Sequence, residues 1–299
     1  MSDILRIEGS GRSADLYSWL TAKAKGMEAL AGILGFGLPE IENFWFDGAG
    51  AGSSWRGARV GRRQITLPLK VYANSRTELA ALLSDLSVIL DPFTLTPDYE
   101  GGTARLFFGM PDGQEWYADV VRSSGGDWAR KTDSDDRRYF KTSVVLEAGD
   151  AFWTRTTPES FIIRGGAGAD EPTLLPRMAK LRVSSAAAFG VKEVSNVGDT
   201  FAWPIFRVSG PTTHVILTGA NGETIDWTGT LASGETLTID MRNGIVEDSL
   251  GANRYGGLAT APRFWSIAPG KSRVVVQADN TDEDSSIFAQ WWPRRWAVV

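Results

Sequence analysis

His214 is the only histidine of the 299-residue chain, and the chain contains no cysteine. A Ser-His-Asp triad needs an imidazole that a carboxylate holds beside an exposed serine. His214 instead begins a predicted strand at Val215, and no Gly-x-Ser-x-Gly turn is found. Without cysteine there are no disulfides, thiolate ligands or cysteine nucleophiles, and one histidine excludes a multi-histidine metal site within one chain. We therefore expect no enzyme, with no catalytic, metal-binding or cofactor-binding residues.

Two clusters of carboxylates and two clusters of glycines are further candidate sites. The acidic residues are Asp133, Asp135 and Asp136, and Asp279, Asp282, Glu283 and Asp284. Paired carboxylates can hydrolyse glycosides, but both clusters lie in predicted turns, where solvated charge is the main interpretation and a calcium site the alternative. The glycine-rich segments 48–54 and 165–170 lack the lysine of a phosphate-binding loop, so they indicate flexible loops.

Arginines gather beside a tryptophan at residues 55–63. The cluster contains Trp55, Arg56, Arg59, Arg62 and Arg63. Arginine and aromatic side chains together can bind nucleic acid, but they also form ion pairs between subunits. The net charge of −5 makes the chain a poor primary partner for DNA, so we favour the subunit-interface interpretation.

Tryptophan is abundant, with 12 residues, and several lie in the C-terminal half. Exposed aromatic rings such as Trp227 and Trp265 could stack on sugars or contact a partner, whereas buried ones would pack in a core. The sequence does not separate these alternatives, so glycan or partner contact by Trp227 and Trp265 is left open.

The N-terminal half is predicted to be a mixture of helix and strand. Near-helical spacing from Leu16 to Ile33 predicts one or two short helices, and alternation over Arg63–Tyr72 predicts a strand. Pro68 indicates that this strand lies at a sheet edge or contains a bulge. A clear helix follows, capped by Asn74 or Ser75 and ended by Asp91-Pro92, with an apolar stripe at Leu79, Leu82, Leu83, Leu86 and Ile89.

Short strands and turns dominate the rest of the chain. A hairpin is expected around Pro111-Asp112-Gly113 and a strand over Tyr139–Glu147. Beyond a glycine- and proline-rich stretch, the pattern predicts an antiparallel sandwich of jelly-roll type. Its expected strands are Leu181–Ser185, Val191–Ser195, Ile205–Val208, Val215–Thr218, Glu223–Trp227, Thr236–Asp240, Phe264–Ile267 and Arg273–Ala278. We expect a mainly β protein with an N-terminal α+β domain over residues 1–165, a linker over 166–178 and a C-terminal β-sandwich over 179–299.

No positively charged segment followed by an apolar stretch opens the chain, which predicts that a secretory signal is absent. The most apolar early run, Met27 to Leu38, is too short to span a bilayer. We therefore expect no membrane insertion.

Several segments, in order, resemble the distal tail proteins of siphophages. The C-terminal matches are Asn196-Val197-Gly198-Asp199 leading to Trp203-Pro204, Ser209-Gly210-Pro211, Ser233 to Asp240, Phe264 to Gly270, and Trp292-Pro293-Arg294-Arg295-Trp296. The N-terminal part is similar through Gly61 to Leu67, one helix, a hairpin, and Glu147 to Trp153. Ala151 departs from the family's Asp-Pro-Tyr-Trp, and the resemblance covers roughly residues 40–299.

This resemblance implies a non-enzymatic virion protein at the distal end of a long non-contractile tail, made in the host bacterial cytoplasm. It implies a ring of six copies, formed by the N-terminal domain, with a galectin-like C-terminal sandwich facing outward. Trp55, Arg59, Arg62 and Arg63 become candidate ring-interface residues. The implied partners are the tail tube protein, the tape measure protein and the hub or adhesion proteins, and DNA passes through without specific binding. The alternative is a carbohydrate-binding module that recognises host glycans through the C-terminal sandwich, and a paired-carboxylate hydrolase is the third class.

Overall fold

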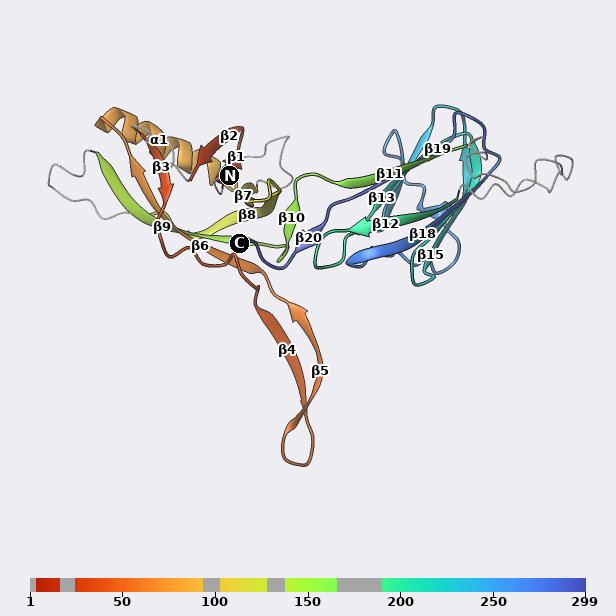
Figure 1. Cartoon of the computed structure of the whole chain (residues 1–299), viewed down its shortest axis with the longest axis horizontal. Coiled ribbons are helices and arrows are strands. Elements are labelled where there is room, and N and C mark those ends of the chain that lie inside the picture. The colour runs from red at the N-terminus through yellow and green to blue at the C-terminus, as the bar shows by residue number, and fades with distance from the viewer. Residues whose placement is uncertain (1–3, 17–24, 94–102, 128–137, 166–189) are drawn as a thin grey trace, which may run out of the picture. The chain divides into compact units, whose positions relative to one another are not determined.

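The computed structural model describes residues 4–16, 25–93, 103–127, 138–165 and 190–299. The chain divides into two compact units. The first unit contains Met1–Thr156 together with Arg295–Val299, and the second contains Thr157–Arg294. Antiparallel strands dominate both units (Figure 1), so the expected mainly β fold is confirmed. No helix in the described part of the chain is long and apolar enough to cross a membrane.

The first unit is built on one antiparallel sheet with the strand order β2-β1-β7-β8-β9-β6-β3. Short strands β10 and β20 pair with each other, and β10 also pairs with β8. The bounds are β1 Ile4–Gly9, β2 Arg12–Asp15, β3 Gly26–Ala29, β6 Arg63–Tyr72, β7 Ala104–Gly109, β8 Glu115–Gly125, β9 Tyr139–Ala148, β10 Trp153–Arg155 and β20 Arg294–Arg295. The predicted hairpin and the predicted strand after it are therefore confirmed as β7–β8 and β9.

Helix α1, Arg76–Ile89, lies on one face of this sheet (Figure 1). Ser75 caps it, because its hydroxyl oxygen accepts a 3.2 Å hydrogen bond from the backbone N–H of Glu78. Leu79, Leu86 and Ile89 are buried in the core that the helix shares with the sheet. The predicted helix, its cap and its apolar stripe are confirmed.

Strand β6 lies inside the sheet, so the prediction of an edge strand was wrong. It pairs with β9 along its whole length, and its last residues also pair with β3. Pro68 is tolerated because the backbone nitrogen and carbonyl of one strand residue point to the same side. On that side the Pro68 carbonyl accepts a hydrogen bond from the Leu30 N–H, and the next backbone pairing is the bridge of Leu34 with Thr66. The N–H that proline lacks would therefore point to a gap between these two pairings, and its absence breaks neither of them.

The helical prediction for Met27 to Ile33 is also corrected. Gly26–Ala29 forms β3, in which Met27 alone is buried, and Leu16 is buried where its backbone bonds to both Leu5 and Ala29. Trp19 and Leu20 lie outside the described residues. The apolar residues follow helical spacing, but the open flank of β6 supplies hydrogen bonds that stabilise an extended strand instead.

The second unit contains a five-stranded sheet, order β11-β19-β13-β16-β17, and a four-stranded sheet, order β12-β18-β14-β15. Their inward side chains form one hydrophobic core that includes Phe206, Ile239, Val215 and Val276. The bounds are β11 Glu159–Arg164, β12 Gly190–Asn196, β13 Ile205–Ser209, β14 Thr212–Thr218, β15 Thr224–Leu231, β16 Thr236–Asp240, β17 Ile245–Asp248, β18 Gly270–Asp279 and β19 Ser286–Trp291, with the 3₁₀ turn η4 at Tyr255–Gly257.

Several strands of this unit differ from the sequence prediction. Phe264–Ile267 forms only the isolated bridge of Ile267 with Ala202, while β17 and β19 were not predicted. Glu159–Arg164, expected in the first domain, pairs along its length with β19, and the last five residues belong to the first unit. Pairing with residues far away in the sequence decides where Glu159–Arg164 and the last five residues lie. The expected linker 166–178 and the expected strand Leu181–Ser185 lie outside the described residues.

Candidate assembly interface

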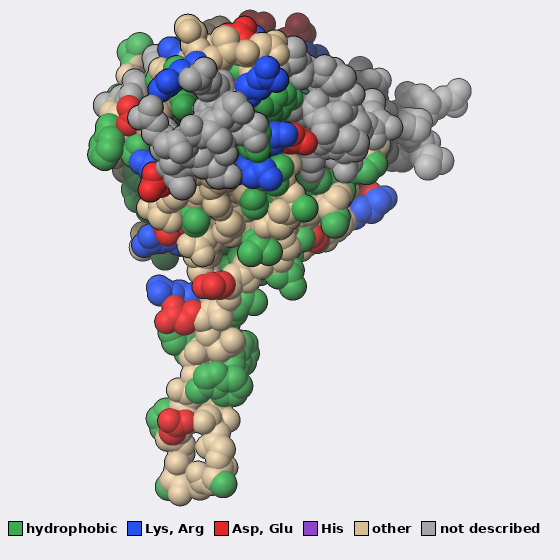
Figure 2. Space-filling view, turned by 90° about the vertical axis from the view of Figure 1, so that its left-hand side faces the viewer, with side chains coloured by type: hydrophobic (Ala, Val, Ile, Leu, Met, Phe, Trp, Pro, Cys, Tyr) green, Lys and Arg blue, Asp and Glu red, His purple; other side chains and the backbone are tan. Residues whose placement is uncertain are grey.

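A two-stranded hairpin of β4, Ile41–Asp47, and β5, Ser53–Val60, extends away from the sheet of the first unit (Figure 1). Every residue of β4 is exposed, and β5 is exposed or half-buried. Hydrophobic side chains gather along the hairpin (Figure 2). Gly48–Gly52, expected to be part of a flexible loop, forms the turn at its tip.

One face of the hairpin carries a cross-strand tryptophan pair. Trp45 and Trp55 lie opposite each other in the register and remain 60% and 58% exposed. Asn43 lies on the same face, and its Oδ1 accepts a 3.0 Å hydrogen bond from Nε1 of Trp55. Ile41 pairs with Val60 farther along this face. Such aromatic pairs stabilise a ribbon, but the rings are still largely open to solvent.

The opposite face is apolar as well, with two charged side chains at its base. Phe44 and Phe46 are exposed there, and the Arg56 guanidinium lies 5.3 Å from the Phe46 ring centroid. Arg59 and Glu42 form a 2.6 Å ion pair across the strands. An isolated two-stranded hairpin is marginally stable in water. A ribbon that is apolar on both faces is typical of an element that another surface covers.

Arg63 holds the base of this hairpin together. Its side chain is buried, and the residue is only 1% exposed. Nη1 donates to the carbonyls of Gly35 and Gly37 at 2.5 and 2.6 Å, Nε donates to Ala151 at 2.7 Å, and Nη2 donates to Trp296 at 2.5 Å. Burial lowers the pKa of Arg63 to about 10, against a smaller opposing effect of the Asp150 charge. The guanidinium stays charged at neutral pH and satisfies four backbone carbonyls.

The backbone at the foot of the hairpin approaches β6 very closely. Gly35 has a φ of +94°, and a Cβ atom there would overlap the carbonyl oxygen of Gln64. The Gly61 N–H donates a 2.9 Å hydrogen bond to the Glu40 carbonyl, which joins the two strands where they leave the body of the unit. Glycine at position 35 is therefore required by both conformation and space.

Aromatic rings pack around the residues that Arg63 contacts. Phe36 packs edge-on against Trp153 at 5.2 Å, and Phe152 packs edge-on against Trp296 at 4.6 Å. The Arg295 guanidinium lies 4.5 Å from the Trp116 ring centroid. The C-terminal residues thus complete the core of the first unit instead of the sandwich.

The four residues expected at a subunit interface have different environments in the structure. Trp55 and Arg59 lie on the exposed hairpin, and Arg62 lies exposed beside its base with a 3.4 Å ion pair to Glu147. Arg63 is buried inside the first unit, so its role as a contact residue is corrected to that of an internal clamp. Phe44, Trp45 and Phe46 were missed, although three consecutive aromatic residues before a glycine-rich turn are a strand and hairpin signal.

Trp227 and Trp265 are core residues of the second unit. Each is 2% exposed, and each indole N–H donates to a backbone carbonyl, Trp227 to Arg254 at 3.1 Å and Trp265 to Leu217 at 3.2 Å. Their rings are therefore unavailable for stacking on a sugar. This expectation is corrected, because inward-facing positions of a sandwich take the largest apolar side chains.

The carboxylates weighed as catalytic groups make local structural contacts. Asp279 contacts Nδ1 of His214 at 2.9 Å, while Asp226 contacts Nε2 at 2.8 Å. Asp282 accepts from the backbone N–H groups of Asp284 and Ser285, which closes a turn. Asp133, Asp135 and Asp136 lie outside the described residues. Within the described ranges no three acidic or histidine side chains are grouped as metal ligands.

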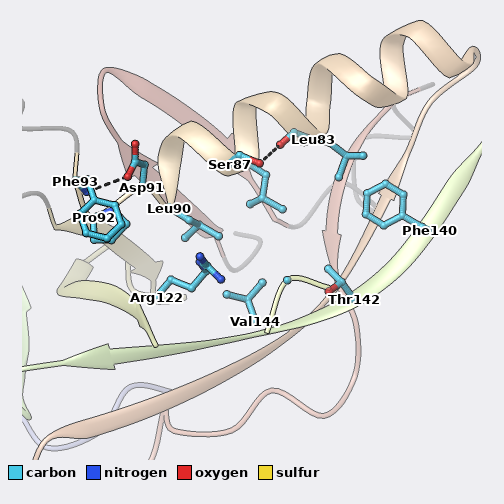
Figure 3. Close-up of a pocket in the computed structure, with 12 residues that line it drawn as sticks. Leu83, Ser87, Leu90, Asp91, Pro92, Phe93, Arg122, Phe140, Thr142 and Val144 are labelled. Atoms are coloured by element: carbon cyan, nitrogen blue, oxygen red, sulfur yellow. Dashed lines mark hydrogen bonds between the residues drawn. The ribbon is translucent and has the colours of Figure 1, made fainter. Parts of the chain in front are cut away.

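A pocket of about 420 Å³ lies between α1 and β9 in the first unit (Figure 3). Leu83 and Leu90 face it from the helix, and Phe140 and Val144 face it from the strand. Arg122 also lines it, with its Nη1 donating to the Gly125 carbonyl at 3.1 Å. Its lining is mainly aliphatic and aromatic, and it contains no pairing of a nucleophile with a base.

Comparison with known proteins finds a family similarity within the second unit. Residues 197–294 match the family described as the siphovirus-type tail component, C-terminal domain. Over this segment the chain is similar to that family. The segment lies within the second unit and contains β13 to β19, so it covers most of the sandwich described above and leaves out β11 and β12. The sequence resemblance to siphophage distal tail proteins is thereby confirmed.

Two solved structures share the fold over nearly the whole chain. The chain aligns with the Dit protein of SPP1, described as a paradigm of the hub adsorption apparatus in phages that infect Gram-positive bacteria. That alignment has a TM-score of 0.65 and 12% identity, and covers 97% of this chain and 98% of that chain. A chain of the phage P2 baseplate in its activated conformation with Ca aligns with a TM-score of 0.53 and 12% identity, covering 99% and 98%. No curated protein sequence matches the chain.

Proposed function

We propose that this structural tail component forms a closed homo-oligomeric ring, of six copies, at the distal end of a siphophage tail. The first unit makes the ring, and the second unit faces outward as a sandwich. The ring joins the tail tube and tape measure proteins to the hub and adhesion proteins, and it has no enzymatic activity. The domain family and the shared fold support the tail role, while the ring rests on the hairpin.

The exposed β4–β5 hairpin is the observation that carries this proposal. Its two apolar faces need cover on both sides, and a head-to-tail contact between identical copies supplies it without a second kind of protein. Each copy would lay its hairpin on the body of the next, so the contact repeats around the ring until it closes. The net charge of −5 suits a lumen through which DNA passes without binding.

The test replaces the tryptophan pair of the hairpin. In the Trp45→Ser/Trp55→Ser variant, the oligomer of the purified protein should dissociate at concentrations where the wild type remains assembled, as measured by light scattering after size exclusion. Phe201→Ser removes an aromatic ring of similar exposure from the second unit and should leave assembly unchanged.

Assembly in the tail provides the second readout. Complementation of a phage that lacks this protein should give tails with the wild type and with Phe201→Ser, but not with the tryptophan variant. Normal tails with the tryptophan variant would overturn the role of the hairpin. Electron microscopy that shows the second unit lining the lumen would overturn the assignment of the two units.

A further inference from the structure

The outer face of the five-stranded sheet in the second unit holds an open hollow of about 580 Å³. This volume falls within the roughly 300–1,000 Å³ that is usual for small-ligand sites. The lining residues come from four neighbouring strands and the loop after β17. They are Arg207, Ser209, Thr236, Thr238, Glu247, Asp248, Ser249, Gly251 and Phe288.

One row of side chains crosses this hollow. Phe288 of β19 pairs with Arg207 of β13, Arg207 pairs with Thr238 of β16, and Thr238 pairs with Glu247 of β17. Their neighbours along each strand, among them Phe206, Ile239 and Val246, are buried in the core. Because side chains alternate across a sheet, the four residues of the row share its outer face.

The two charges of the row have no partner within the described part of the chain. Neither Arg207 nor Glu247 takes part in any of the side-chain hydrogen bonds or ion pairs of the described residues. Their backbones lie two strands apart, which corresponds to about 10 Å, and no ion pair joins the two side chains in the described structure. Thr238 lies between them, and the hydroxyls of Ser209 and Thr236 lie in the adjoining row.

The arginine, the carboxylate and the hydroxyl groups together indicate which kind of ligand would fit. An anion that Arg207 attracts would meet the Glu247 carboxylate, and a cation would meet the guanidinium. A neutral molecule with many hydroxyl groups satisfies both, because hydroxyls accept from arginine and donate to a carboxylate. The ring of Phe288 at the end of the row supplies an apolar surface for the C–H face of a pyranose.

We propose that this hollow binds a neutral oligosaccharide of about two sugar rings. Arg207 donates to one sugar, Glu247 accepts from the next, and Phe288 packs against a ring face. The site is distinct from the buried Trp227 and Trp265 and from the hairpin. It goes beyond the ring-forming role and does not depend on it.

The test is an array of neutral and acidic oligosaccharides that is probed with the full-length protein. We expect binding to neutral structures, with affinity about ten- to a hundred-fold weaker in Arg207→Ala and Glu247→Ala, as for lost hydrogen bonds to charged groups. Arg273→Ala on β18, in the other sheet, is the matched control and should bind as the wild type does. Thermal unfolding should be unchanged in the Arg207 and Glu247 variants, since neither side chain has a hydrogen-bond or ion-pair partner among the described residues.

Three results would overturn the proposal. The first is the absence of binding to any neutral oligosaccharide on the array. The second is binding that Arg207→Ala and Glu247→Ala leave unchanged. The third is hydrogen exchange showing that β13, β16 and β17 are protected in assembled tails by another protein, which would make the face a protein interface.

Discussion

The Nη2 atom of Arg63 donates a 2.5 Å hydrogen bond to the backbone carbonyl of Trp296, 233 residues farther along the chain. The second unit is an insertion in the chain of the first unit, since the chain leaves the first unit after Thr156 and returns at Arg295. The same guanidinium bonds to Gly35 and Gly37 at the foot of the hairpin. One buried side chain therefore joins the returning C-terminus to the base of the candidate interface.

Replacement of Arg63 should destabilise the first unit strongly. Arg63→Met removes the donor of four backbone carbonyls, and the free energy of unfolding should fall by about 3–5 kcal/mol, as when one side of a buried polar cluster is removed. Arg63→Lys should recover only part of this loss, because an ammonium cannot reproduce the planar fork. Urea denaturation measures the change, with Arg62→Met as the exposed control. An Arg63→Met protein as stable as the wild type would contradict the role of a clamp.

Gly35→Ala should destabilise the first unit by at least about 2 kcal/mol, since the new Cβ is strained at positive φ and overlaps the Gln64 carbonyl. Gly37→Ala is the matched control, because nothing lies within 4 Å of a Cβ at that position. The melting temperatures of the two variants give the comparison. Equal melting temperatures would show that the close approach of backbone at Gly35 does not exist in solution.

His214 should have a pKa above its ordinary value of about 6.5. Hydrogen bonds to Asp279 and then Asp226 raise the pKa, and both ring nitrogens can donate only when the imidazole is protonated. Because the chain has one histidine, its ring proton signals in NMR can be assigned without ambiguity. Asp279→Asn should lower the measured pKa of His214. A wild-type pKa at or below 6.5 would contradict the arrangement in which Asp279 and Asp226 each contact one ring nitrogen.

The same pKa fixes the sign of a stability change with pH. The folded protein binds the proton more tightly than the unfolded chain does, so the stabilisation is full below about pH 6.5. It is lost as the pH rises through the folded-state pKa. The wild type should therefore exceed His214→Gln in stability by more at pH 5.5 than at pH 9, as measured by unfolding of the second unit.

A fragment comparison tests the boundary between the units. Residues 157–294 should unfold cooperatively, whereas residues 174–299 should be less stable by about 2–5 kcal/mol. The shorter start removes β11, whose Ile163 is buried and whose Phe161 packs edge-on against Phe206 at 6.4 Å. Circular dichroism during urea denaturation gives the comparison, and equal stability of the two fragments would place β11 outside the sandwich.

Local patterns in the sequence determined the elements that depend on near neighbours. The helix Arg76–Ile89 was predicted with its cap, because capping and an i, i+3, i+4 stripe involve residues within a few positions of each other. The hairpin at Pro111–Gly113 and most strands of the sandwich followed from turn chemistry and alternation. The order of five short motifs also pointed to the tail-component family, because motif order survives when overall identity is low.

Only the tertiary structure decided which side chains meet. Arg62 and Arg63 are adjacent in the sequence and identical in type. Arg63 is nevertheless buried and donates to four backbone carbonyls, whereas Arg62 is exposed. The partners of Arg63 include residues 88 and 233 positions away, which no local pattern contains. In the same way, Pro68 marks an edge in isolation but lies inside a sheet whose ladder is interrupted opposite it. Burial and long-range pairing, the terms that a single sequence window does not include, set these outcomes.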